Sequence, residues 1–532
     1  MNRRGFIQTA SFAAAVSQLL VSCKPAKIIP GKILGASANI GHLLRDGKTG
    51  PVVSTTRKKA VIIGAGVSGL SAGRHLLEKG VTDFWVMDLE DHAGGNASHG
   101  ENATSAYPLG AHYLPTPNSD LKDYLNFLES CGVITGYDEK QLPVYNDFYV
   151  CFDSQERLFI NGRWQDGVIP HYGVPADELK QLERFLQMME KFRSQKGTDG
   201  NDAFAIPVNN SSKDEVFVQL DAITMQKWMH ENGFTSPYLT WYVNYCTRDD
   251  FGTTINQISA WAGIHYFAGR KGLGANATQS DVITWPEGNG FLVKALQANF
   301  NGHIKKNALA LNVEQKDNLV QITWLDTTAH TMHIVEAEQC ILAVPQFVAV
   351  RLLKDAARQK LVHDHIQYAP WMVANLLVSN LTEKEGIEMS WDNVIYNSQS
   401  LGYVDATHQL VQQKMPLKNI TYYLPLTEKD AATERKTAQQ KTHAEWTELI
   451  ITDLEKVHPG IRNAIQEINV MVWGHAMAQP LPGMIHGNTR ENLSRSVNNC
   501  IHFAHTDLAG ISIFEEAFYQ GIGAAEKLLK QL

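Results

Sequence analysis

Residues 60–77 read AVIIGAGVSGLSAGRHLL, and this stretch is the most informative part of the chain. It opens with an apolar, largely β-branched run at 60–63, which is typical of a strand buried in a parallel sheet. Gly64, Gly66 and Gly69 follow, and leucines then recur at helical spacing. The stretch therefore predicts a strand, a glycine-rich turn and a helix, which is the arrangement that binds a dinucleotide.

The three glycines of this turn have separate predicted roles. Gly64 permits the tight turn, Gly66 lets the backbone approach a pyrophosphate, and Gly69 lets the helix pack against the strand. The helix start offers free N–H groups and a positive dipole end to the phosphates. A second strand is predicted at 84–87, and Asp88 at its end can accept hydrogen bonds from ribose hydroxyls.

Several later stretches extend this pattern in a fixed order. They are residues 94–96 (GGN), 109–113 (LGAHY), 285–290 (WPEGNG), 312–313 (NV), 341–345 (ILAVP), 501–507 (IHFAHTD) and 514–525 (FEEAFYQGIGAA). Together with the glycine turn they resemble the flavin-containing amine oxidoreductase superfamily, which includes monoamine and polyamine oxidases, protoporphyrinogen oxidase and the phytoene desaturases. The resemblance implies an α/β protein with a Rossmann-like FAD-binding domain and an inserted α+β substrate-binding domain.

The resemblance also implies which residues bind the FAD. Asp507 would hydrogen-bond the ribityl or pyrophosphate region, and the backbone at Ile513 and Phe514 would face the pyrimidine edge of the flavin. A helix N-terminus at that edge would stabilise negative charge on the reduced flavin. The other predicted FAD-binding residues are Gly94, Gly95, Asn96, Gly110, Ala111 and Val313.

The same motifs divide the chain into discontinuous domains. The predicted FAD-binding domain comprises residues 58–118, 281–349 and 466–532, and the predicted substrate domain comprises residues 119–280 and 350–465. Residues 24–57 are rich in Gly, Ser, Thr and Lys without sustained periodicity, which predicts a tether. The polar stretch 194–216 is predicted to be a surface loop.

Candidate catalytic residues are those expected to face the flavin ring. Trp473 could wall the pocket and His475 could exchange a proton with substrate, although both also suit purely structural roles. His112 follows Gly110 and Ala111 and could reach the same cavity. A dense aromatic set could cage an amine through cation–π attraction, although core packing is the more common role of such a stripe; it comprises Tyr238, Trp241, Tyr242, Tyr245, Trp261, His265, Tyr266 and Phe267.

Two positions depart from the family pattern. Many amine oxidases of this superfamily have a lysine, linked through water to the flavin, in the strand after the return strand; here Asn375 is close to that place. Asn96 stands where the family usually has arginine. Both departures leave FAD binding credible but make the reaction type less certain.

Residues 1–23 predict a targeting signal. Arg3 and Arg4 precede a short apolar stretch and resemble a twin-arginine export signal, and the sequence LVSC ending at Cys23 resembles a bacterial lipobox. This predicts a periplasmic or cell-envelope lipoprotein tethered through a lipid on Cys23. A basic amphipathic N-terminus is the alternative.

Charge and cysteine spacing limit the classes of partner that the chain is expected to bind. The net charge of −8 argues against a dedicated nucleic-acid binder. No two of the six cysteines have CxxC spacing, so no zinc or dithiol motif is predicted. The expected partner is a small-molecule substrate.

Four functions remain open on these grounds. The first is oxidation of an amine or polyamine C–N bond by hydride transfer to FAD. The second is a flavin-dependent desaturase or isomerase of a nonpolar substrate, which the missing lysine favours. The third is a non-catalytic tethered flavoprotein, and the fourth is an NAD-dependent dehydrogenase.

Overall fold

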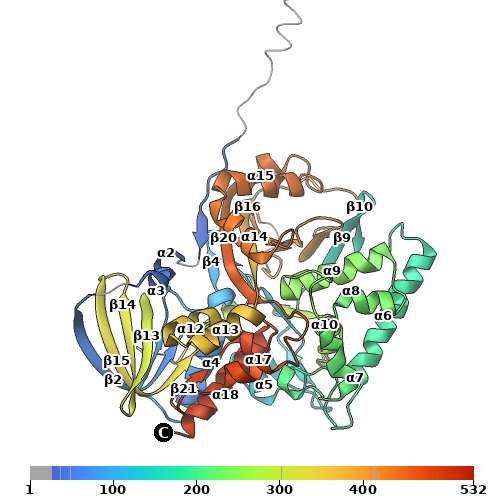
Figure 1. Cartoon of the computed structure of the whole chain (residues 1–532). Helices are drawn as coiled ribbons and strands as arrows, with labels where there is room; N and C mark the ends of the chain where they lie inside the picture. Colours follow the sequence, from blue (N-terminus) through green and yellow to red (C-terminus); the bar gives the residue numbers. More distant parts are fainter. Residues whose placement is uncertain (1–26, 36–37, 48–49, 301, 412–414) are drawn as a thin grey trace, which may run out of the picture.

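The computed structural model describes residues 27–35, 38–47, 50–300, 302–411 and 415–532. The described chain forms two large sheets with helices packed against both (Figure 1). A seven-stranded sheet occupies the left of the view, an eight-stranded sheet the upper centre, and a lobe of helices from residues 176–268 the right. The predicted export signal at 1–23 and its Cys23 lie outside the described residues and stay predictions.

The seven-stranded sheet is built on the predicted glycine-rich turn. Strand β2 (Val52–Ile63) runs parallel to β3 (Phe84–Met87), and helix α4 (Val67–Glu78) connects them. The four residues that end β2 are between 0% and 5% exposed, as expected for a strand covered on both faces. The predicted strand–turn–helix–strand unit is therefore confirmed. The order is β12-β3-β2-β15-β14-β13 with β21 on β15, where the other strands are β12 (Ile304–Lys305), β13 (Ala308–Lys316), β14 (Leu319–Asp326), β15 (Thr331–Leu342) and β21 (Ile501–Phe503).

Glycines allow the helices to pack closely on this sheet. A Cβ atom on Gly69 would lie 1.9 Å from the carbonyl oxygen of Gly64, and one on Gly521 would lie 2.2 Å from that of Ser68. Gly521 belongs to the C-terminal helix α18 (Phe514–Leu529), which packs along α4. Helices α4 and α18, which are far apart in the sequence, thus form one layer over the sheet.

The eight-stranded sheet separates two groups of helices. Helices α14 (Ala431–Gln440) and α15 (His443–Leu454) cover one face, with Trp446 fully buried beneath them. The helical lobe covers the other face and comprises α6 (Ala176–Ser194), α7 (Glu215–Val218), α8 (Met225–Glu231), α9 (Pro237–Phe251) and α10 (Ala260–Ala268). The strand order is β1 (Ile33–Gly35), β20 (Ile465–Ala478), β16 (Tyr368–Val378), β19 (Lys418–Pro425), β18 (Gly402–Asp405), β17 (Asp392–Ile395), β9 (Glu156–Ile160) and β10 (Arg163–Asp166).

Short elements complete the described chain. Strands β6 (Tyr113–Pro115) and β11 (Val282–Thr284) pair where the chain passes between the two large sheets. No helix in the described residues is long and apolar enough to cross a membrane. The other strands and helices are β4 (His99–Glu101), β5 (Ala106–Pro108), β7 (Ile134–Tyr137), β8 (Pro143–Tyr145), α2 (Ala38–Gly41), α3 (Leu43–Asp46), α5 (Lys122–Ser130), α11 (Gly290–Leu296), α12 (Gln346–Leu353), α13 (Ala356–His365), α16 (Ile461–Ala464) and α17 (Asn488–Ser494).

The prediction of a tether over 24–57 is wrong for the described part of that range. Strand β1 extends the eight-stranded sheet beside β20, and the Lys27 ammonium donates to the Ile465 carbonyl at 2.6 Å. Residues 52–59 form the outer part of β2, paired with β15. Their polar side chains concealed the strand because this part of the sheet is largely exposed to solvent.

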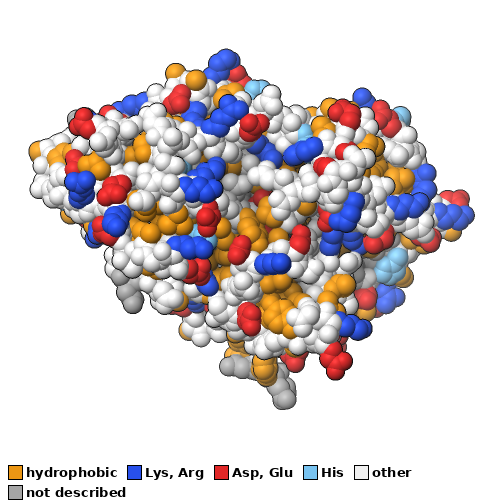
Figure 2. Space-filling view, turned by 90° about the horizontal axis from the view of Figure 1, so that it is seen from below, with side chains coloured by type: hydrophobic (Ala, Val, Ile, Leu, Met, Phe, Trp, Pro, Cys, Tyr) orange, Lys and Arg blue, Asp and Glu red, His pale blue; other side chains and the backbone are white. Residues whose placement is uncertain are grey.

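Two further predictions need correction. Residues 466–478 belong to β20 in the eight-stranded sheet, whereas the sequence analysis assigned them to the FAD-binding domain. The stretch 194–216 is irregular over most of its length, but Ala203, Phe204 and Val208 are fully buried, so it is not a surface loop. On the face shown in Figure 2, acidic and basic side chains are interspersed rather than gathered by sign.

Candidate active site

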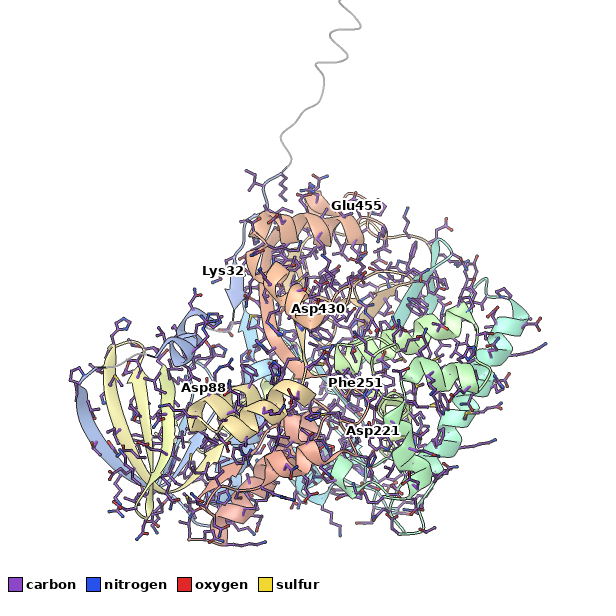
Figure 3. The ribbon with its side chains drawn as sticks, in the orientation of Figure 1. Lys32, Asp88, Asp221, Phe251, Asp430 and Glu455 are labelled. Carbon is purple, nitrogen blue, oxygen red and sulfur yellow. The ribbon has the colours of Figure 1, made fainter. Side chains whose placement is uncertain are left out.

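The dinucleotide turn has the geometry that phosphate binding requires. The first backbone hydrogen bond of α4 runs from Leu70 N–H to the Gly66 carbonyl at 3.0 Å, so the N–H groups of the preceding turn are not used within the helix. Asp88 accepts hydrogen bonds from Ala65 N–H at 2.6 Å and Glu90 N–H at 2.9 Å. These bonds fix the carboxylate at the end of β3, on the seven-stranded-sheet side of Figure 3.

The space beside this turn fits the predicted cofactor. A Cβ atom on Gly66 would meet no other atom within 4 Å, so the backbone faces open space there. The next glycine pair borders the same turn, because Gly94 N–H donates to the Ala65 carbonyl at 2.9 Å and Gly95 begins the turn that follows. The open space at Gly66, next to the start of α4, suits a pyrophosphate, as the FAD prediction requires.

Val313, a predicted FAD-binding residue, lies in β13 at the edge of the seven-stranded sheet. Val313 is 2% exposed and pairs with Ile322 of β14, so its backbone serves the sheet. The residue of β13 beside Asp88 is Ala308, whose N–H donates to the Asp88 carbonyl at 2.7 Å. The contact of Val313 with FAD stays a prediction.

A cavity of about 900 Å³ lies beside the second glycine turn, where Asn96 forms part of its wall, and extends into the middle of the molecule. Seven of the predicted site residues line it: Asn96, Gly110, Ala111, His112, Trp473, Ile513 and Phe514. Ile513 is the N-cap of α18, so the start of that helix faces the cavity as predicted. The buried side-chain oxygen of Asn289, also in the wall, has no hydrogen-bond partner among the described residues, which suits a wall built for a polar ligand.

Hydrogen bonds between β20 of the eight-stranded sheet and the segments around Asn96 and Leu109 hold this wall in place. The Asn96 amide donates to the Ala476 carbonyl of β20, and Ala111 N–H donates to the Asn96 carbonyl at 2.9 Å. The Trp473 indole donates to the Leu109 carbonyl at 2.7 Å and lies opposite Trp371 of β16. Trp473 therefore walls the cavity, and Asn96 binds a backbone carbonyl.

His112 lies among aromatic rings in the cavity wall. Its ring stacks on Tyr423 with centroids 4.5 Å apart and lies 5.5 Å from Trp391. Burial lowers the pKa of His112 to about 3, so the imidazole is neutral at physiological pH. It can offer hydrogen bonds to a bound substrate without carrying a charge.

His475 does not line the cavity, which contradicts its predicted catalytic role. Its ring stacks on Phe347 with centroids 4.3 Å apart, and the residue is exposed. Trp371 pairs with Trp473 but Ala369 pairs with Met477, so β20 contains two extra residues opposite Pro370. This bulge, where proline cannot donate to the ladder, turns His475 away from the site.

Asn375 also lies outside the cavity, although the sequence placed it near the expected lysine. Its amide nitrogen donates to the Pro108 carbonyl at 3.1 Å, and its oxygen accepts from the Thr421 hydroxyl at 2.7 Å. The side chain is 3% exposed and is absent from the cavity wall. Asn375 thus connects β16 to β19 and to the end of β5.

We predict that Asn375→Ala lowers stability without affecting chemistry. Removal of the amide leaves the Pro108 carbonyl and the Thr421 hydroxyl unsatisfied, which costs about 1–3 kcal/mol of unfolding free energy. Urea unfolding would measure the loss, and Thr421→Val is the matched control for one of the two bonds. A tenfold or greater slowing of flavin reduction at unchanged stability would contradict this structural role (that threshold corresponds to about 1.4 kcal/mol).

Asp507 is an internal anchor rather than part of the cavity wall. It accepts the Gln346 N–H at 2.7 Å and the Tyr368 hydroxyl at 2.6 Å, and it lies 2.9 Å from His505. Burial opposes ionisation, but His505 and these hydrogen bonds together keep the Asp507 pKa below its usual value. The Oδ1 atom of Asp507 is buried and has no hydrogen-bond partner among the described residues, so the predicted hydrogen bond with the ribityl or pyrophosphate region stays a prediction.

The sequence analysis missed four charged residues in the cavity wall: Asp249, Asp250, Arg270 and Glu515. Asp249 and Asp250 end α9 just before Phe251, which Figure 3 places in the middle of the molecule. In the sequence, these two adjacent acids lie in a helical segment that is otherwise mainly apolar and aromatic. That contrast was the signal from which they could have been predicted as site residues. Glu515 is 2% exposed, and burial raises its pKa to about 6.

Arg270 and Asp249 differ in how they are paired. Arg270 contacts both carboxylate oxygens of Asp250, at 3.0 and 2.8 Å. Asp249 accepts no hydrogen bond within the described residues and faces the cavity. Burial, with the neighbouring Asp250 charge, raises the pKa of Asp249 to about 7. The cavity therefore holds one ion pair and one carboxyl group without a partner.

Comparison with known proteins agrees with this architecture. Residues 62–128 match a family model described as an NAD(P)-binding Rossmann-like domain. A structure of putrescine oxidase bound to putrescine superimposes with a TM-score of 0.65 at 14% identity, over 90% of this chain and 100% of that chain. Cyclohexylamine oxidase from Brevibacterium oxydans IH-35A gives 0.63 at 13% identity, over 89% and 99%. The fold is the two-domain amine-oxidase fold.

Other similarities show how far this fold is shared. A fatty acid isomerase from P. acnes superimposes with a TM-score of 0.62 at 16% identity, over 88% of this chain and 97% of that chain. In sequence, polyamine oxidase 7 of Oryza sativa subsp. japonica is 30% identical over 105 residues, which is 19% of this chain. That match spans only 22% of the rice protein, so the similarity in sequence is local.

Proposed function

We propose that this chain is an FAD-dependent oxidoreductase that oxidises the C–N bond of an amine or polyamine. The observation that carries the proposal is the unpaired Asp249 carboxyl group in a cavity that is otherwise mainly aromatic and apolar and that reaches Asn96 beside the second glycine turn. A buried carboxylate without a partner attracts a cation, and the aromatic walls add cation–π attraction. The similarity to two amine oxidases supports the same reading.

The cavity residues have distinct roles in such a reaction. FAD, when bound against the wall formed by Asn96, Ala111 and Ile513, would supply the hydride acceptor. Asp249 binds the substrate ammonium and can receive a proton from it at a carboxylate oxygen, which leaves the neutral amine required for hydride loss. Trp473 closes the wall, and neutral His112 orients the substrate.

The proposal predicts a yellow protein whose flavin is bleached by amines without oxygen. Stopped-flow absorbance with a panel of mono-, di- and polyamines would measure the rate of bleaching. A polyene or a porphyrinogen serves as the comparison substrate. Failure of every amine would refute the proposal.

A desaturase or isomerase acting on a nonpolar substrate is the second candidate. Two observations favour it: no lysine lines the cavity in the described residues, and the fatty acid isomerase shares the fold. Bleaching or product formation with a nonpolar substrate, and none with amines, would establish this alternative. Absence of any reductive half-reaction would instead favour a non-catalytic flavoprotein.

A further inference from the structure

A second cavity of about 820 Å³ adjoins the first and extends away from the glycine turns. The two cavities share His112, Tyr113, Pro115, Asp249, Arg270 and Tyr423. The second one contains none of the wall residues Asn96, Trp473 and Ile513, so it lies beyond the place predicted for the flavin. A substrate long enough would occupy both.

The wall of the second cavity contains two acids side by side in a sheet. Glu156 of β9 and Asp392 of β17 are direct partners in the parallel register, and both line the cavity. Like charges at such a position destabilise a sheet unless a cation neutralises them. The Tyr245 hydroxyl, at 3.4 Å from an Asp392 oxygen, is the hydrogen-bond donor that this carboxylate has among the described side chains.

The protein supplies little positive charge to balance these acids. Among the residues that line the second cavity, Arg270 is the basic side chain of fixed charge, and it is already paired with Asp250. Asp281, the fourth acid of this wall, accepts hydrogen bonds from Thr278 N–H and its hydroxyl. Asp249, Glu156 and Asp392 therefore form an acidic set without a cationic partner in the described chain.

Aromatic rings in the same wall indicate which kind of cation would fit the second cavity. Tyr245, Tyr266, Trp391 and Tyr423 line the cavity together with these acids. Ring faces with carboxylates suit an alkylammonium group, whose methylene groups pack on the rings. The described residues contain no cluster of three or more His, Cys, Asp or Glu arranged to hold a metal ion.

From this juxtaposition we propose that the second cavity binds the far ammonium group of an aliphatic diamine, with Glu156 and Asp392 as its specificity-determining carboxylates. The inference rests on the proposed amine-oxidising function, because the near amine group must lie at Asp249 beside the flavin. It adds that the chain selects substrates with two positive charges over those with one.

Binding of such a dication is coupled to proton release. Burial, then the neighbouring carboxylates Glu156 and Asp249, raises the pKa of Asp392, and burial also raises the pKa of Glu156. The charged groups around them are Asp166, Asp249 and Arg270, and Tyr245 is the adjacent hydroxyl. Burial therefore favours the protonated forms of both acids, whereas an entering cation favours their ionised forms.

The test measures binding to holoenzyme whose flavin has been photoreduced without oxygen, since this form cannot oxidise an amine. Calorimetric titration compares 1,4-diaminobutane with butylamine at neutral pH, in two buffers of different ionisation enthalpy. We expect the diamine to bind at least about 30-fold more tightly, with net proton release that butylamine does not produce. Diamines of other lengths would define the spacing of the two subsites.

Variants of the two carboxylates test whether the preference for the diamine arises in the second cavity. Asp392→Asn and, independently, Glu156→Gln should abolish most of the preference for the diamine and reduce the proton release, while butylamine binding is retained. Asp177→Asn, an exposed acid of α6 that lines neither cavity, is the control and should change neither the preference for the diamine nor the proton release. Equal binding of the two amines, or equal weakening of both by Asp392→Asn, would overturn the inference. Flavin bleaching of the oxidised enzyme by butylamine would still support the proposed function in that case.

Discussion

Replacement of Gly66 by valine is expected to give a folded protein that carries almost no flavin. Gly66 has φ −71° and ψ −179°, which is extended backbone that valine adopts readily. A Cβ at this position meets no other atom of the chain within 4 Å, so the side chain causes no clash in the protein itself. It would instead occupy the space into which a pyrophosphate must come to reach the start of α4.

The expected loss of FAD affinity is at least about 100-fold, or about 2.7 kcal/mol. Flavin absorbance per mole of purified protein measures retention, and the melting temperature of the flavin-free form measures folding. Gly69→Ala is the matched control, because its Cβ would lie 1.9 Å from the Gly64 carbonyl oxygen. That variant should lose stability even without flavin, whereas Gly66→Val should not. Stoichiometric flavin in Gly66→Val would show that the cofactor does not approach this turn.

The dinucleotide turn was predictable because its structure is locally encoded. The strand, the glycines, the helix and Asp88 are consecutive in the sequence, and each has a pattern that depends on near neighbours. The cavity residues next to glycines, such as Gly110 and Ala111, were predictable through the family resemblance. Here local pattern and tertiary structure agree.

The catalytic residues were harder to predict because their orientation depends on distant strands. The bulge in β20 lies opposite Pro370, so whether His475 faces the cavity is determined by a residue about a hundred positions earlier. Asn375 was placed near the expected lysine position by the family resemblance, but Thr421 and the Pro108 carbonyl decide where its amide points. No local pattern contains these partners.

The acidic residues of the second cavity were also not predictable from local sequence, because strand pairing brings them together. Glu156 and Asp392 become neighbours only when β9 pairs with β17, two strands that are far apart in the sequence. Each acid is unremarkable in its own segment. Their significance arises from the cavity they share with Asp249, which the tertiary structure creates.

Replacement of Asp249 by asparagine is expected to have the largest effect on catalysis. The change keeps the shape of the side chain but removes the charge that would hold the substrate ammonium. Because the pair would be desolvated, we expect kcat/KM for amines to fall by about 100-fold, or about 2.7 kcal/mol, with most of the change in KM. Flavin content should be unchanged, since Asp249 lies away from the glycine turns.

The pH dependence of amine binding provides a second test of the role of Asp249. The pKa of Asp249 is raised to about 7, so the carboxyl group is neutral below that pH and ionised above it. Amine binding should therefore strengthen as pH rises through about 7, and Asp249→Asn should abolish this limb. The midpoint of this pH limb depends on the charged groups around Asp249, which are Asp250, Arg270 and Asp392.

Stability should change in the opposite sense to binding. A carboxyl group whose pKa is raised on folding stabilises the fold while it is protonated, and this stabilisation is lost as pH rises from its usual value through about 7. Asp249→Asn should therefore raise the melting temperature of the flavin-free protein more at pH 8 than at pH 5 (values chosen about one unit above and about two units below that pKa). Thermal melts at the two pH values measure the difference.

Asp250→Asn is the control that distinguishes loss of the Asp249 charge from loss of any acid in the cavity wall. Asp250 is paired with Arg270, so its replacement leaves a buried guanidinium without a partner and should lower stability at both pH values. It should retain the limb of the pH profile that Asp249 produces. If Asp249→Asn and Asp250→Asn instead weakened amine turnover alike, with the pH limb intact in both, then Asp249 would not be the group that binds the ammonium. Unchanged turnover of a nonpolar substrate by Asp249→Asn would then favour the desaturase or isomerase reading.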